Sequence, residues 1–249
     1  MAQHFIVRAI LRAVRALPGY PRLRVLDLSC GRGEILASLH ADGCVVRGTH
    51  YRGDDFEIKS GKEMFLTPEI PVDTGVDLTR PLPYDEASFD VVILSEVVEH
   101  LPTWITVLHE AGRVLAPGGH LVLSTPNLQR LHSRWKFFWT GTHKLIRERP
   151  GADLAPGDLY AYHINPLDLP LAHTVLHQAS LRIERLYFTR FKPEHAWLIL
   201  FYPLVWLATR AELRDAEVAR WMLHPAALAS EQLLCVARKR PQKTEIMPS

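Results

Sequence analysis

The strongest constraint on this fold is the alternation of short apolar runs with segments of helical periodicity. The clearest strand-like runs lie at residues 23–29, 89–95 and 119–126, with weaker ones at 44–50, 181–188 and 232–239. Helical patterns occupy 33–42 and 104–119, and the second ends in Pro-Gly-Gly. Apolar strands that alternate with helices predict a mostly parallel sheet covered by helices on both faces. We therefore expect an α/β chain with a Rossmann-like sheet.

Three segments extend this minimal pattern, and we expect all of them to belong to a single domain over residues 1–249. Residues 1–20 read as a basic amphipathic helix that ends at Pro18-Gly19. Residues 127–162 are rich in aromatic residues, arginine, glycine and proline, which indicates a cap or lid insertion. Residues 194–222 form an apolar helical insertion.

The apolar run inside the last segment allows two interpretations. It extends from Ala196 to Ala208, which is too short to span a bilayer, and Pro203 interrupts it. A buried helix is the default expectation. Contact with a membrane surface or a lipid substrate is the sharper alternative, because Trp and Tyr are scattered through the run.

Composition restricts the compartment and the partners. The formal net charge is +2, which gives no argument for nucleic-acid binding. Cys30, Cys44 and Cys235 are odd in number and form no CxxC pair, so a disulfide framework and a zinc–thiolate site are both disfavoured. We expect a cytoplasmic protein, with the inner face of the membrane as its alternative location.

The stretch VLDLSCGRGEIL at residues 25–36 predicts a ligand-binding loop. It reads as a strand, a turn of small residues and a helix start. Gly31 and Gly33 let the backbone turn tightly and approach a ligand, and the following helix offers free N–H groups. The run differs from the dinucleotide motif GxGxxG, and Asp27 inside the strand end favours a different ligand.

Three stretches together resemble the class I S-adenosylmethionine-dependent methyltransferases. VLDLSCGRG is similar to their first motif, which usually has glycine where this chain has Ser29. LPYDEASFDVVILSEVVEHL resembles the region of their fourth strand, and HEAGRVLAPGGHLVLSTPN resembles their next helix and fifth strand. The resemblance covers residues 23–126 well. It implies a seven-stranded sheet, methyl transfer and S-adenosylmethionine as the cofactor.

The resemblance also assigns cofactor contacts by position. The methionine part of the cofactor would lie on the first loop, the adenine beside the segment after the third strand, and the sulfonium end beside the fourth strand. These groups comprise Asp27, Ser29, Cys30, Gly31 and Gly33, then Asp77 and Leu78, then Ser95 and Glu96.

One position departs from the family pattern. An acidic residue usually ends the second strand and holds the ribose hydroxyls, but this chain has His50 or Tyr51 there. The resemblance implies that these two residues contact the cofactor in its place. Asp54 or Asp55 could substitute from the following loop. The departure leaves a catalytically silent scaffold with a cofactor fold as one alternative function.

The stretch SEVVEHLP at residues 95–102 carries the candidate catalytic groups. On a helical turn Glu96 would face Glu99 at i+3 and His100 at i+4. Two adjacent carboxylates repel unless a proton or a cation lies between them. The plain alternative is that Glu96 borders the cofactor while Glu99 and His100 make structural hydrogen bonds.

A similar Glu-x-x-Glu-His plus a distant histidine occurs in the ubiquinone-biosynthesis O-methyltransferases and in small-RNA 2′-O-methyltransferases. The resemblance implies a divalent metal such as Mg²⁺, Mn²⁺ or Zn²⁺, held by Glu96, Glu99, His100 and His163. The metal would lower the pKa of an acceptor hydroxyl that attacks the sulfonium methyl. Alternatively, His100 would accept the proton directly, with Glu99 as its support.

The sequence says less about the acceptor molecule than about the fold or the cofactor. Residues 133–149 place arginine and lysine among aromatic residues, which suits stacking on RNA bases but also a pocket for a sugar or a lipid-linked molecule. The wider pattern STPN…SR…F…TG, which begins at residue 124, resembles bacterial methyltransferases associated with cell-surface glycans and lipids. We expect O-methylation of a small-molecule, sugar or lipid-linked acceptor, with RNA 2′-O-methylation as the alternative.

Overall fold

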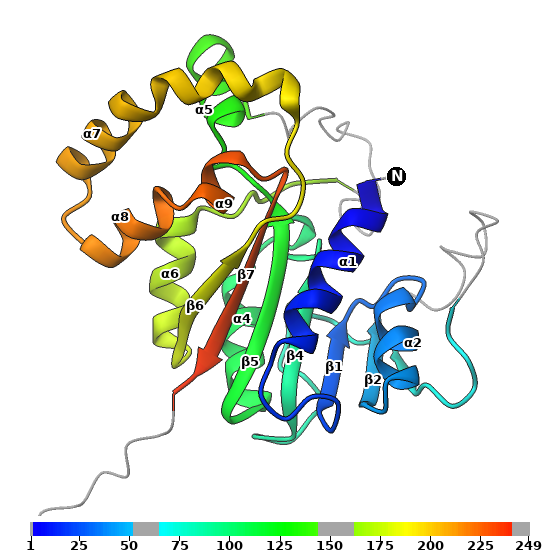
Figure 1. Ribbon diagram of the computed structural model, residues 1–249. Helices are drawn as coiled ribbons and strands as arrows, with labels where there is room; N and C mark the ends of the chain where they lie inside the picture. Colours follow the sequence, from blue (N-terminus) through cyan, green and yellow to red (C-terminus); the bar gives the residue numbers. More distant parts are fainter. Residues whose placement is uncertain (1, 52–64, 144–161, 241–249) are drawn as a thin grey trace, which may run out of the picture.

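A seven-stranded sheet forms the centre of the protein (Figure 1). The computed structural model describes residues 2–51, 65–143 and 162–240. The order across the sheet is β3-β2-β1-β4-β5-β7-β6. The strands are β1 (Arg24–Leu28), β2 (Val45–His50), β3 (Val72–Thr74), β4 (Phe89–Ser95), β5 (Leu115–Pro126), β6 (Leu181–Tyr187) and β7 (Gln232–Lys239).

The pairing directions confirm the predicted fold class. Strands β1 to β5 pair in parallel, while β7 runs antiparallel to both β5 and β6. Because parallel strands end at one edge, the carboxyl ends of β1, β2, β4 and β5 lie together. The sheet is mixed but mostly parallel, as the alternation of strands and helices predicted.

Successive residues of the central strands enter two separate cores. Val25 and Ile93 pack under α1 (Ala2–Arg15) and α2 (Glu34–Ala41). Leu26 and Leu94 pack on the other face, under α4 (Ile105–Val114) and α6 (Leu169–Gln178). The side-chain period of two makes both faces apolar, so these strands read as nearly continuous hydrophobic runs.

The helix predicted over 104–119 is shorter in the structure. Helix α4 ends at Val114, and Leu115 already pairs with Phe89 as the first residue of β5. Pro117 cannot continue a helix, and Gly118 adopts φ 80°. The Pro-Gly-Gly signal therefore lies within the early part of β5, beyond the helix end.

The insertion over 194–222 also differs from its default expectation. It forms η3, a 3₁₀ segment at Pro193–Phe201, then α7 (Tyr202–Glu212) and α8 (Ala216–Met222). Helix α8 and the short α9 (Pro225–Ala229) contribute Trp221 and Ala226 to the core. Most of η3 and α7 is exposed, so a buried helix is the wrong interpretation for that half. Among the described helices, none has the length and apolarity needed to cross a membrane.

The predicted cap over 127–162 is described only in part. Helix α5 (Leu131–Thr140) follows β5 directly, while residues 144–161 lie outside the described residues. Figure 1 places α5 beside the long η3–α7 segment, away from the sheet.

Close packing of α4 on the chain after α6 yields a stability prediction. A Cβ on Gly112 would lie 2.5 Å from the backbone oxygen of Ala179, which cannot move as a flexible side chain can. We expect Gly112→Ala to lower the free energy of unfolding by roughly 1–2 kcal/mol, despite the higher helix propensity of alanine. Chemical denaturation measures the change. His109→Ala, at an exposed position of the same helix, is the control and should change stability by less than about 0.5 kcal/mol. An equally stable Gly112→Ala protein would contradict this packing.

Candidate active site

The loop after β1 has the backbone geometry of a ligand cradle. Ser29, Gly31 and Gly33 have φ values of 67°, 54° and 78°, in the left-handed region that favours glycine. Ser29 is held there by its own N–H, which donates to the Thr49 hydroxyl at 2.9 Å. Cys30 N–H donates to the Thr49 carbonyl at 3.1 Å. The side chain and backbone of Thr49 thus fix a serine where glycine would cost less.

Asp27 lies beneath this loop with one unsatisfied oxygen. Its side chain is 1% exposed, and among the described residues its Oδ1 has no hydrogen-bond partner. Burial raises the pKa of Asp27 to about 7. Such an oxygen suits an incoming donor, and the ammonium group of an amino-acid moiety on the loop would supply one.

His50 ends β2 at the position where the family pattern has an acidic residue. Its Nε2 donates to the Gly31 carbonyl at 2.9 Å and lies 3.4 Å from Cys30 Sγ. His50 therefore supports the loop after β1 in this structure. Tyr51 follows and lines a neighbouring cavity, whereas Asp54 and Asp55 fall outside the described residues.

The predicted adenine side opens into a cavity of about 700 Å³, with Tyr51, Val76 and Asp77 in its lining. Asp77 Oδ1 accepts hydrogen bonds from the N–H and hydroxyl of Thr79. The bond from the Thr79 hydroxyl has the larger effect, and both bonds hold the pKa of Asp77 below its usual range. Asp77 is therefore a carboxylate near neutral pH. Leu78 instead lies buried in the core. Of the two predicted adenine neighbours, only Asp77 lines the cavity.

The carboxyl end of β4 places two glutamates against β5. Ser95 is the last residue of β4, and Glu96 follows it with φ 54°. The Ser124 hydroxyl donates to Glu96 Oε1 at 3.0 Å, and the Thr125 hydroxyl donates to Glu99 Oε2 at 3.0 Å. Both carboxylates are thus aimed by hydroxyls from the end of β5.

Burial sets the charge of this pair. Glu99 is fully buried, and burial together with the nearby Glu96 raises its pKa to about 8. Burial also raises the pKa of Glu96 to about 7. Two such groups resist ionising together unless a positive charge compensates them.

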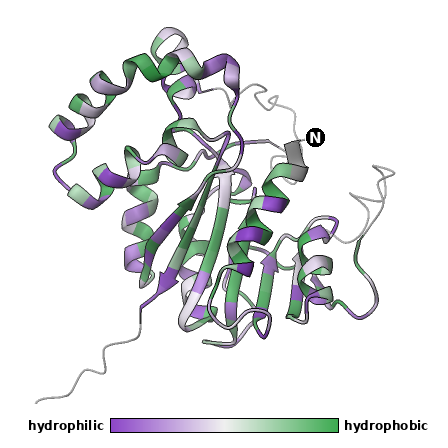
Figure 2. Ribbon diagram, viewed as in Figure 1, coloured by the Kyte–Doolittle hydropathy of each residue, from purple (hydrophilic) through white to green (hydrophobic). Residues whose placement is uncertain are grey.

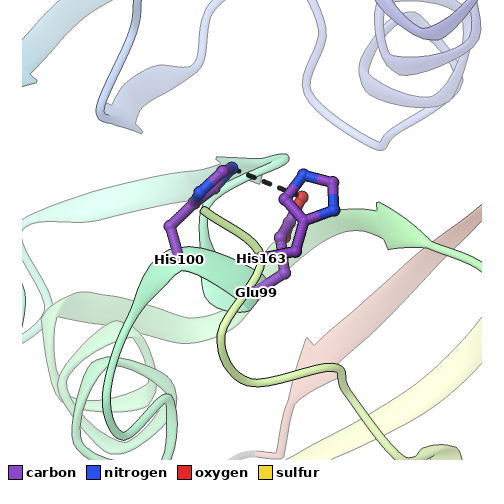
Figure 3. A group of neighbouring side chains, drawn as sticks. All are labelled: Glu99, His100 and His163. Atoms are coloured by element: carbon purple, nitrogen blue, oxygen red, sulfur yellow. Dashed lines mark ion pairs between the residues drawn. The ribbon is translucent and has the colours of Figure 1, made fainter. Parts of the chain in front are cut away.

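Glu99 also converges with two histidines that were predicted as ligands, His100 and His163 (Figure 3). One ligand atom each from Glu99, His100 and His163 lies within 4.8 Å of the others. Glu99 and His100 come from η1, a 3₁₀ turn at Val98–His100 that follows β4, and His163 comes from the segment before α6. Glu96, the fourth predicted ligand, lies outside this group, with Oε1 on Ser124.

Backbone hydrogen bonds bring the distant histidine to the site. The Glu99 carbonyl accepts from the N–H of Ile164 at 2.9 Å and of Asn165 at 3.0 Å. The Asn165 amide donates to the Pro102 carbonyl at 3.1 Å. These bonds hold His163 so that its ring centre is 4.8 Å from that of His100.

Each of the two histidines has a ring nitrogen that could act as a ligand. His100 Nδ1 donates to the Tyr162 carbonyl at 3.0 Å, so in the neutral ring the lone pair is on Nε2, 4.0 Å from Glu99 Oε1. Burial lowers the pKa of His163, which keeps that ring neutral near pH 7. Among the described residues, buried Glu99 Oε1 has no hydrogen-bond partner. An orphaned carboxyl oxygen beside two imidazoles is a donor set that fits a divalent cation.

Sequence reasoning missed the residues that position these groups. Thr49 holds the loop, Ser124 and Thr125 orient the glutamates, and the Tyr162 carbonyl sets the His100 tautomer. A polar Ser-Thr pair at the end of the apolar run 119–126 was a readable signal. Nothing local marked Tyr162, because its role depends on a backbone atom.

The buried Asp27 predicts a pH dependence of stability. Its folded pKa is above the value of 3.8 that an exposed aspartate has, so the folded protein binds the proton more tightly than the unfolded chain. The stability contribution is therefore favourable at low pH and declines between about pH 4 and 7. We expect the cofactor-free wild type to lose about 2 kcal/mol more than Asp27→Asn between pH 5 and 8. Denaturant unfolding at both pH values measures this, and parallel pH profiles for the two proteins would refute it.

Comparison with known proteins places this geometry in a family. Residues 2–156 match the family model described as a methyltransferase domain. The ubiquinone biosynthesis O-methyltransferase of Vibrio cholerae serotype O1 is 30% identical over 135 residues, which is 51% of each chain. That of Alkalilimnicola ehrlichii is 31% identical over 140 residues, covering 55% of this chain and 54% of the relative. The matched region thus spans about half the length of these curated relatives.

Solved structures agree on the fold. A SAM-dependent methyltransferase from Archaeoglobus fulgidus superposes with a TM-score of 0.57 at 20% identity, covering 95% of this chain and 94% of that one. The cyclase SpnF also superposes, with a TM-score of 0.53 at 17% identity over 94% and 81% of the two chains, so the fold by itself does not set the reaction. The chain belongs to the methyltransferase-domain family, and its fold is that of the class I S-adenosylmethionine-dependent methyltransferases.

Proposed function

We propose that this protein transfers the methyl group of S-adenosylmethionine to a hydroxyl oxygen of a small-molecule, sugar or lipid-linked acceptor, aided by a divalent cation. The observation that carries the proposal is the convergence of Glu99, His100 and His163 at the carboxyl end of the sheet. The similarity to ubiquinone biosynthesis O-methyltransferases over half of the chain supports oxygen as the atom methylated.

The positions of the loop after β1 and of Glu96 support methyl transfer at the carboxyl end of the sheet. The cofactor loop follows β1, and Glu96 follows the adjacent strand β4. A cofactor seated on the loop would direct its sulfonium end towards Glu96, with the Glu99–His100–His163 group one helical turn further along. An acceptor oxygen between them would face the methyl group in line with the breaking carbon–sulfur bond.

The reaction is an in-line displacement. The acceptor oxygen loses its proton to solvent or to a nearby base and attacks the methyl carbon. The carbon–sulfur bond breaks, which gives a methyl ether and S-adenosylhomocysteine. A cation bound by the three residues would lower the pKa of a hydroxyl on it, and two neighbouring hydroxyls would chelate it. Glu96 would remain free to border the sulfonium.

The ligand chemistry favours some cations over others. Two neutral imidazoles with one carboxylate suit Mn²⁺, Fe²⁺ or Zn²⁺ better than Mg²⁺, which prefers oxygen ligands and retains its waters. The ligands of such a cation must be deprotonated, so its binding should displace the proton that the raised pKa of Glu99 keeps on the carboxyl group.

Metal binding can be tested without knowing the acceptor. We expect the wild type to bind Mn²⁺ in calorimetry, and Glu99→Gln and His163→Ala to bind it at least about tenfold more weakly. His109→Ala, on an exposed histidine of α4, is the matched control and should bind as the wild type does. Proton release upon binding at pH 7, measured in two buffers of different ionisation enthalpy, should disappear in Glu99→Gln.

Methyl transfer is the second readout. With catechol as a simple diol probe, we expect formation of S-adenosylhomocysteine that chelation abolishes and Mn²⁺ restores. Transfer that continues under chelation, with unchanged rates in Glu99→Gln and His163→Ala, would refute the cation-assisted reaction. Failure to bind S-adenosylmethionine would refute methyl transfer altogether.

A further inference from the structure

A large apolar surface lies outside the proposed methyl-transfer site. It is formed by α5, η3 and α7, and we call it the arm face. Six of its side chains are more than half exposed, Leu200 to 80% and Phe138 to 74%. They are Phe138, Trp139, Ile199, Leu200, Leu204 and Leu207. Together they expose roughly 700 Å² of apolar area, more than the patch of a few hundred Å² that a monomer usually shows.

The arm face is a packed surface. The ring centre of Trp135 on α5 lies 5.3 Å from that of Trp197 and 5.3 Å from that of Phe201, both in η3. These contacts join two segments that are about sixty residues apart in the sequence. Figure 2 shows hydrophobic residues along the same helices. The apolar side chains are therefore presented outwards on a fixed frame.

The frame is connected to the methyl-transfer site at both ends. Helix α5 begins shortly after Ser124 and Thr125, which aim the two glutamates. At the other end, Lys192 precedes η3 and forms an ion pair with Glu231 at 2.9 Å. The Glu231 carbonyl accepts from the N–H of Asn127 at 3.3 Å, directly after β5. A molecule or surface bound to the arm face would therefore lie next to the side of the methyl-transfer site where the acceptor enters.

Composition identifies the occupant. Four of the six tryptophans of the chain lie on α5, η3 and α7, and Trp and Tyr are the residues enriched at membrane–water interfaces. Residues 131–140 and 193–214 carry four basic side chains against two acidic ones. Arg134 donates to the Gln129 carbonyl at 2.8 Å, so the basic groups left for the surface are Lys136, Arg210 and Arg214. A second copy docked through the same face would bring two surfaces with an excess of positive charge together. An anionic lipid surface complements both the apolar area and the positive charge.

We propose that the arm face docks on the surface of an anionic lipid bilayer, with its apolar side chains at the level of the headgroups. Docking would turn the acceptor side of the methyl-transfer site towards the lipid, so that a hydroxylated lipid-linked molecule could enter from it. The lipid-linked acceptor rests on the proposed function, whereas the docking itself does not.

Vesicle binding tests the docking directly. We expect the full chain to float with vesicles of phosphatidylcholine mixed with phosphatidylglycerol, and to bind pure phosphatidylcholine about tenfold less. The double variant Leu200→Glu/Leu204→Glu should lose binding about tenfold or more, because charged groups would have to enter the interface. Val45→Glu is the control: Val45 is 70% exposed at the amino end of β2, the opposite edge of the sheet. It should bind as the wild type does.

Tryptophan fluorescence gives an independent readout. Trp104 and Trp221 are buried in the core, whereas Trp139, Trp197 and Trp206 are exposed on the arm face. We expect a blue shift of the emission on adding anionic vesicles, and a smaller shift for the double variant. Circular dichroism and denaturant unfolding establish that both variants are folded.

Three outcomes would overturn the proposal. They are absence of binding to anionic vesicles, equal binding by Leu200→Glu/Leu204→Glu, and a concentration-dependent dimer in light scattering that the double variant abolishes. The last would assign the arm face to a second copy. None of these measurements requires cofactor, metal or turnover, so failure of the docking is separate from failure of the methyl-transfer reaction.

Discussion

Parallel strand pairing is the constraint on which the site depends. Strands β1, β2, β4 and β5 pair in parallel, so the residues that follow them meet at one edge of the sheet. The glycine loop, His50 and the Glu96–Glu99 stretch are distant in sequence and become neighbours for this reason. The antiparallel β7 returns along β5 and does not change the edge at which the site forms.

Buried carboxylates give the edge its chemistry. Asp27 and Glu99 each keep one oxygen without a hydrogen-bond partner among the described residues, although burial of such an atom costs free energy. Burial raises the pKa of both groups, and Glu96 raises that of Glu99 further. Free energy given up at positions of this kind is typical of binding sites, where an incoming donor or cation restores the missing interaction. The two orphaned oxygens lie at the places assigned to the cofactor loop and to the cation.

Several features could be predicted because local patterns were sufficient. The apolar strands and intervening helices gave the fold class, and the three motifs gave the family. The helix end predicted from Pro-Gly-Gly was wrong, because the helix stops earlier and Leu115 already pairs with Phe89 in the sheet. The apolar run from Ala196 to Ala208 suggested a buried helix, but hydrophobicity alone does not say whether a helix finds a partner. Within the described residues, no other element covers most of the apolar side chains of η3 and α7.

The sequence by itself determined the alternating fold, the glycine loop after β1 and the residue types Glu-x-x-Glu-His, because each depends on periodicity or spacing over a few residues. Only the tertiary structure decided which of those groups meet. It brought His163 to Glu99 and His100 through backbone hydrogen bonds to the Glu99 carbonyl, and it left Glu96 with Ser124. It also placed His50 on the Gly31 carbonyl. These contacts join residues far apart in the chain, and their energies depend on burial that only the assembled sheet creates.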